Sequence, residues 1–226
     1  MGHTARVRIV LAHGAGSTVA AARALIGLDE QAEIIGVEDR SGDIAAVVEG
    51  IDAAVASTAE CTHVMGVSLG AHALLRWAHG RARTPNLVCI LPAWVGDGPH
   101  SARSATAYAA DQVRTLGIRG ALDAMPRDPS VAEVAELLRL SWSDYTSEHL
   151  HDSLVTASQS AGPSREELLD VESPVTIIGW YGDAFHPHGV ALEWARHLRR
   201  PRVAMAARPS VPLLQRALRS LVAPSP

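Results

Sequence analysis

The sequence predicts one α/β domain built on a mostly parallel, six-stranded sheet with helices on both faces. Short apolar runs alternate with alanine-rich stretches along most of the 226 residues, as strands alternate with helices. The apolar runs are continuous, which is typical of parallel strands buried on both faces. A chain of this length with 47% hydrophobic residues can bury one large core, so we expect a single domain over residues 1–226.

Six apolar runs are the expected strands. They are RVRIVLA (6–12), AEIIGV (32–37), THVMGV (62–67), NLVCILPA (86–93), PVTIIGWY (174–181) and RVAMA (202–206). Helices are expected near residues 17–28, 43–57, 69–82, 187–199 and 211–222. The interval from about 99 to 168 is more polar and rich in helical patterns, with alanine and leucine at helical spacing near 102–117 and 131–140.

Composition excludes several classes of function. The net charge is −4 and no basic run exceeds Arg199-Arg200, so we expect neither nucleic acid nor an anionic membrane as a partner. All 20 basic residues are arginine, which excludes mechanisms that need a lysine, such as a Schiff base or a phosphate-loop lysine. Cys61 and Cys89 lie in or beside apolar runs and are expected to be free thiols. His13 interrupts the first apolar run too early for a signal peptide or membrane span, so a cytoplasmic protein is expected.

The segment GVSLG, residues 66–70, carries the clearest chemical signal. Ligands of parallel sheets bind beyond the carboxyl ends of the strands, and this segment follows the third strand. Gly66 and Gly70 permit the sharp strand-to-helix turn that exposes the Ser68 hydroxyl as a nucleophile. The backbone N–H groups of Leu69 and of Ala15, which follows the first strand, would then form an oxyanion hole.

Three loops together resemble the α/β-hydrolase family. They are HGAG (13–16), GVSLG (66–70) and GDAFHP (182–187), and the resemblance extends over nearly the whole chain. It implies a compact α/β-hydrolase fold that lacks the family's first two strands, with residues about 99–168 forming a small helical cap. It also implies that Asp183 is the acid of a catalytic triad and that the base follows the last strand.

The position of the family's base holds no histidine. The segment from 202 to 226 places Arg208 there, and an arginine cannot act as a general base. His186 is the strongest candidate for a relocated base, because it shares a loop with Asp183. The alternative that His186 only shapes this loop stays open. The remaining candidates are His100, His149, His151 and His188.

Four further residues are candidates for the walls of the substrate pocket. His13 precedes the oxyanion loop and is expected to hold that loop in place. Trp94, Trp142 and Trp180 fall in or beside the loops at the carboxyl end of the sheet or in the interval 99–168, and indole rings suit an apolar acyl group. No metal site is expected, because His186 and His188 have no further ligands at zinc-site spacing.

The first hypothesis is a serine hydrolase, an esterase or thioesterase that forms an acyl-enzyme at Ser68 without a cofactor. Its substrate would be a small-molecule or carrier-bound acyl group; the oligomeric state is not predicted. A second hypothesis is a divergent, non-hydrolytic protein of the same fold, such as a cyclase, lyase or binding protein. A third is a nicotinamide-dependent oxidoreductase, since Gly14, Gly16 and Asp39 imitate a dinucleotide motif whose third glycine position holds Val19.

Overall fold

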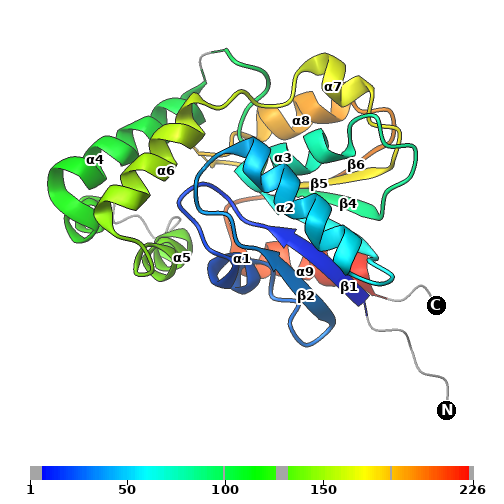
Figure 1. Ribbon diagram of the computed structural model, residues 1–226, viewed down its shortest axis with the longest axis horizontal. Helices are drawn as coiled ribbons and strands as arrows, with labels where there is room; N and C mark the ends of the chain where they lie inside the picture. The colour runs from blue at the N-terminus through cyan, green and yellow to red at the C-terminus, as the bar shows by residue number, and fades with distance from the viewer. Residues whose placement is uncertain (1–6, 99, 126–131, 184, 224–226) are drawn as a thin grey trace.

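The computed structural model describes residues 7–98, 100–125, 132–183 and 185–223 (Figure 1). Its centre is an open six-stranded sheet in the order β2-β1-β3-β4-β5-β6, in which every neighbouring pair is parallel. The strands are β1 (Val7–Ala12), β2 (Ala32–Val37), β3 (His63–Val67), β4 (Asn86–Ile90), β5 (Val175–Trp180) and β6 (Pro201–Ala206). The predicted fold class is therefore confirmed, with an all-parallel sheet.

Helices cover both faces of the sheet. One face packs against α1 (Val19–Ile26) and α9 (Val211–Val222). The other face packs against α2 (Ile44–Ser57), α3 (Leu69–Ala78) and α8 (His188–His197). Successive side chains of a strand point to opposite faces, so every strand in the middle of the sheet must be apolar throughout. The continuous apolar runs of the sequence have this cause.

Three helices form a separate layer beside the sheet, at the left of Figure 1. They are α4 (Ser101–Asp123), α5 (Ala132–Trp142) and α6 (Ser147–Gln159). Gly117 interrupts α4 with a φ of 67°. These helices share a core of their own, consisting of Ala110, Val113, Ala121, Trp142, Tyr145, Leu150 and Leu154. We call α4, α5 and α6 the cap; the predicted interval also contains α7 (Arg165–Leu169), which lies against α3 and α8 instead.

Two predicted boundaries are wrong. The fourth strand was expected to continue to Ala93, but it ends at Ile90 because Leu91 has a φ of 53° and turns its N–H to the carbonyl of Ile178 at 2.7 Å. The third helix was expected to reach residue 82 and ends at Ala78, where His79 leaves the helical region with a ψ of 130°. Apolar periodicity does not register the first of these turns, because Leu91 remains buried and apolar beyond the end of its strand.

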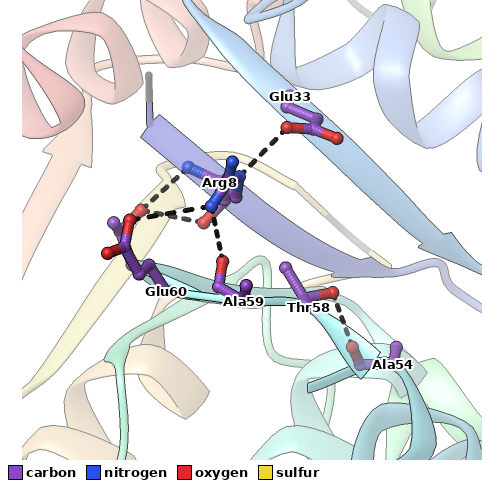
Figure 2. Close-up of polar contacts among 7 residues, drawn as sticks. Arg8, Glu33, Ala54, Thr58, Ala59 and Glu60 are labelled. Atoms are coloured by element: carbon purple, nitrogen blue, oxygen red, sulfur yellow. Dashed lines mark hydrogen bonds and ion pairs between the residues drawn. The ribbon is translucent and has the colours of Figure 1, made fainter. Parts of the chain in front are cut away.

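Polar contacts link β1 to its neighbours at the amino end of the sheet. Arg8 of β1 contacts Glu33 of β2 at 3.1 Å and donates to the Ala59 carbonyl at 2.8 Å, as Figure 2 shows. A depression of about 310 Å³ lies here, lined by Arg8, Glu33, Ile35, Ser57, Thr58 and Ala59. Its charged groups already have partners within the chain, so this end of the molecule serves to join strands.

Cys61 is partly buried and Cys89 fully buried, and both are free thiols, as predicted. Within the part of the chain that the structure describes, no helix is both long and apolar enough to cross a bilayer.

Candidate active site

The turn between β3 and α3 holds Ser68 in a strained conformation. Its φ of 53° and ψ of −114° lie where a residue with a side chain is costly, on the order of 1–3 kcal/mol. A Cβ on Gly66 would lie 2.3 Å from the Gly70 carbonyl oxygen, and one on Gly70 would lie 2.4 Å from the Ala12 carbonyl oxygen. The Ser68 N–H donates to the Ile90 carbonyl at 2.9 Å and helps hold the turn. Glycine at both positions is therefore a requirement of close backbone packing.

The structure brings Ser68, His186 and Asp183 into one hydrogen-bonded chain. The Ser68 Oγ lies 3.1 Å from His186 Nε2, and His186 Nδ1 lies 2.9 Å from Asp183 Oδ2. An ionised carboxylate only accepts hydrogen bonds, so Nδ1 carries the proton and Nε2 presents its lone pair to the serine hydroxyl. This is the arrangement that nucleophile activation requires. The catalytic roles of the three residues remain predictions.

The Asp183 carboxylate is held ionised. Burial alone would raise its pKa, but the hydrogen bond and charge of His186, together with the indole N–H of Trp180, outweigh burial and hold the pKa well below its usual range. Trp180 Nε1 donates to Oδ2 at 2.5 Å and the Phe185 N–H donates to Oδ1 at 2.7 Å. The carboxylate is thus fixed from three directions, and it in turn fixes the imidazole.

The turn after β1, Gly14–Ser17, passes directly over the serine. Its closing hydrogen bond runs from the Ser17 N–H to the Gly14 carbonyl at 3.2 Å, and Gly16 has a φ of 58°. A Cβ on Gly14 would lie 3.1 Å from the Ser68 Cβ, a tighter contact than most side chains make, so glycine eases this approach. Among the described residues no acceptor faces the N–H of Ala15 or of Leu69. Donors left unpaired within the described chain are what an oxyanion hole needs, so the assignment of Ala15 and Leu69 to one stays a prediction.

His13 directly precedes the Gly14–Ser17 turn and contacts its backbone. It is buried, and its Nδ1 donates to the Gly14 carbonyl at 2.9 Å. Burial lowers its pKa, so the ring is neutral and braces the Gly14–Ser17 turn.

The other candidate histidines have partners elsewhere. His100 accepts from the Ala102 N–H at the start of α4, and His151 donates to the Ala110 carbonyl at 3.1 Å. The rings of His149 and His188 lie against Tyr145 and Tyr181, with centroids 5.3 and 4.8 Å apart. Arg208 is exposed in the loop after β6.

The three tryptophans are core residues in this structure, which corrects the expectation of an open aromatic wall. Trp94 and Trp142 are each 2% exposed and Trp180 is 1% exposed. Trp94 packs edge-on against buried His72 with centroids 4.6 Å apart, and Trp142 lies in the core of the cap. Trp180 donates its indole N–H to the Asp183 carboxylate. An indole in a sequence does not reveal which of these environments it will occupy.

Sequence reasoning missed two polar contacts of the site. The first is the bond from Trp180 to Asp183, for which a tryptophan three residues before a loop carboxylate was the only available signal. The second is the bond from the Tyr145 hydroxyl to the Ser17 carbonyl at 2.8 Å, which joins residues 128 positions apart and has no local sequence signal. Asp39, the acid of the dinucleotide alternative, instead accepts hydrogen bonds from Ser41 in its own loop.

No family model and no curated protein matches the sequence. Solved structures do match it. MenH from S. aureus aligns with a TM-score of 0.73 and 13% identity over 98% of this chain and 96% of that one. The enol-lactonase from Burkholderia xenovorans LB400 aligns with a TM-score of 0.72 and 17% identity, covering 98% and 92%. A thermophilic esterase from Thermogutta terrifontis aligns with a TM-score of 0.71 and 18% identity, covering 95% and 88%.

These neighbours share one architecture with this chain over almost its whole length, although fewer than one residue in five is identical. Similarity at that level carries the architecture and leaves the reaction to be argued from the residues of the site. The chain therefore has the α/β-hydrolase fold.

Proposed function

We propose that the protein is a serine hydrolase that cleaves an ester or thioester through an acyl-enzyme at Ser68. The observation that carries this proposal is the hydrogen-bonded chain from Ser68 Oγ through His186 to Asp183. Two of the structural neighbours are named as an esterase and an enol-lactonase, and both names describe cleavage at an ester carbonyl.

In the first half of the reaction, Ser68 Oγ attacks the carbonyl carbon while His186 Nε2 takes the hydroxyl proton. The carbonyl π electrons move to the oxygen, and the N–H groups of Ala15 and Leu69 stabilise the resulting negative charge. Asp183 stabilises the imidazolium. When the tetrahedral intermediate collapses, His186 gives its proton to the leaving alcohol or thiol.

In the second half, a water molecule attacks the acyl-enzyme. His186 takes a proton from the water, the same two N–H groups hold the second oxyanion, and His186 returns the proton to Ser68 Oγ as the acid is released. One imidazole thus serves as base and acid in both halves.

The acyl group is proposed to be apolar. Tyr181 and Phe185, in the loop that carries Asp183 and His186, are 43% and 49% exposed. Exposed aromatic rings that flank the proposed acid and base in the sequence provide apolar surface for a substrate. The leaving group is either a small alcohol or a carrier thiol. Comparing kcat/KM for an ester and for a thioester of the same acyl group decides between them.

A fluorophosphonate probe, which reacts with activated serines, tests the proposal. The wild type is expected to be labelled on Ser68, the Ser68→Ala variant to be unlabelled, and the exposed-serine control Ser143→Ala to be labelled like the wild type. Equal labelling of wild type and Ser68→Ala, or none of either, would refute the hydrolase and leave the non-hydrolytic alternative.

A further inference from the structure

The cap packs directly onto the Gly14–Ser17 turn. A Cβ on Gly16 would lie 2.9 Å from Leu154 Cδ2 and 3.2 Å from Leu150 Cδ1, both on α6. The same position lies 3.4 Å from the indole nitrogen of Trp142, at the end of α5. The turn is therefore enclosed between Ser68 on one side and the cap on the other.

One hydrogen bond joins the cap to the backbone of this turn. The hydroxyl of Tyr145, in the connection between α5 and α6, donates to the carbonyl of Ser17 at 2.8 Å. Tyr145 is only 8% exposed, and burial raises its pKa to about 12, so the hydroxyl keeps its proton near neutral pH. Ser17 is also the residue whose N–H closes the turn onto Gly14. The bond thus fixes the peptide that ends the turn.

Tyr145 is itself held in place from the sheet. The guanidinium of Arg40, in the loop after β2, lies 5.4 Å from the centre of the Tyr145 ring. Arg40 also donates to the carbonyl of Asp144 at 3.1 Å. A donor whose ring and neighbouring backbone are both anchored loses little freedom when it binds, which suits it to setting the position of another group.

We propose that Tyr145 is a positioning residue for the oxyanion hole: its hydrogen bond to Ser17 holds the Gly14–Ser17 turn so that the Ala15 N–H points at the reacting oxygen. This inference rests on the proposed serine hydrolase activity. An oxyanion donor works only within about 2.7–3.1 Å of the charged oxygen, so a turn that shifts slightly loses most of the benefit. The cap accordingly contributes to the rate of reaction as well as covering the site.

The test compares Tyr145→Phe with Tyr108→Phe in the full chain. Tyr108 is 66% exposed on α4, so its variant controls for loss of a phenol hydroxyl from the cap. For Tyr145→Phe we expect kcat on an aryl ester to fall about tenfold, since a misplaced donor costs less than a deleted one, with KM changed less than about twofold. The Tyr108→Phe values should match the wild type.

A second readout separates positioning from general loosening of the structure. A trifluoromethyl ketone forms an oxyanion on addition of a serine hydroxyl, and Tyr145→Phe should weaken its binding by the same factor of about ten as kcat. The pH dependence of kcat/KM should keep its shape, because His186 and Asp183 are untouched.

Three results decide the matter. An unchanged kcat in Tyr145→Phe, or a loss confined to KM, overturns the inference while leaving the hydrolase in place. A loss of kcat with unaltered affinity for the ketone also overturns it. A wild type that neither turns over esters nor reacts with the phosphonate probe overturns the proposed function, and this inference with it.

Discussion

Replacing His186 by alanine tests the proposal that His186 is the general base and shares a loop with the proposed acid, Asp183. The variant removes the one imidazole that lies within hydrogen-bonding distance of Ser68 Oγ, at 3.1 Å, among the described residues. His188→Ala is the matched control, because it lies in the same segment but packs against Tyr181. Both variants delete an imidazole from the same segment, so their difference isolates the contact with the serine.

The expected loss follows from what the imidazole does in the proposed mechanism. Without it, the Ser68 proton must pass to water, which forfeits the factor of about 10²–10⁴ that a positioned base provides. Asp183 then has no imidazole to orient, so its contribution disappears with that of His186. We therefore expect kcat/KM to fall by about 10⁴ or more, which corresponds to about 5 kcal/mol or more of transition-state stabilisation. Adding Asp183→Asn to the His186→Ala variant should lower kcat/KM almost no further.

The assay is hydrolysis of an activated aryl ester, with the active-site concentration of the wild type fixed by phosphonate titration and the fold of each variant checked by circular dichroism. His188→Ala should stay within about threefold of the wild type, as expected for a surface change away from the reacting atoms. Turnover retained within tenfold in His186→Ala would refute the relocated base. So would a collapse of activity in His188→Ala with His186→Ala unaffected.

Three other predictions concern the support of the site. Trp180→Phe removes one of the hydrogen bonds that stabilise the ionised Asp183, so the carboxyl pKa should rise and kcat/KM should fall about tenfold, as measured from pH–rate profiles. Gly70→Ala places a Cβ 2.4 Å from a backbone oxygen and should cost about 3 kcal/mol or more in urea unfolding, whereas Gly189→Ala, which meets nothing within 4 Å, should not destabilise the protein. Burial lowers the pKa of His72 from 6.5 to about 3. Between these two pH values the imidazole is protonated in the unfolded chain and neutral in the folded chain. Stability should therefore fall as the pH drops below about 6.5, by about 2 kcal/mol at pH 5 from this residue, and urea unfolding of His72→Gln should show that much less loss; an equal loss in both proteins would contradict it.

The strands, and the turn that carries Ser68, could be predicted because their signals are local. A strand buried on both faces must be apolar throughout, and a turn that brings Gly70 to within van der Waals distance of β1 must lack side chains. Both predictions needed only the residues within one segment of the chain. Asp183 follows directly after an apolar strand, but the expectation that it is the acid of a triad came from the resemblance to the α/β-hydrolase family.

Most contacts that complete the site could not be predicted, because they depend on how distant segments meet. The sequence favoured His186 among several histidines only because it shares a loop with Asp183; that its ring reaches Ser68 is a property of the fold. Tyr145 meets Ser17 only after the cap has folded over the Gly14–Ser17 turn. Trp180 was expected beside a substrate because its indole is apolar, whereas its N–H bonds to Asp183. The environment of a side chain with both apolar and polar parts is the hardest to predict from the local sequence.

The proposed acid and base lie in one loop, so the distance between their side chains depends on that loop alone. Asp183 and His186 are three residues apart, and the Phe185 N–H closes the turn onto the same carboxylate. Their separation is therefore set by a single local turn, with Pro187 leading directly into α8. A base on a different loop would depend on how two strands and two turns pack together. Local closure needs fewer ordered residues to hold the same two atoms at 2.9 Å.

The segment after β6 makes a structural contact with the cap. Its arginine is exposed, and the N–H of Val211, the first residue of α9, donates to Glu133 of the cap at 2.7 Å. A carboxylate at a helix N-terminus satisfies an otherwise unpaired donor and is stabilised there by the helix dipole. The start of α9 thus anchors α5, whose far end leads to Tyr145. Through this connection the cap is held at both ends, by α9 at one and by the Gly14–Ser17 turn at the other.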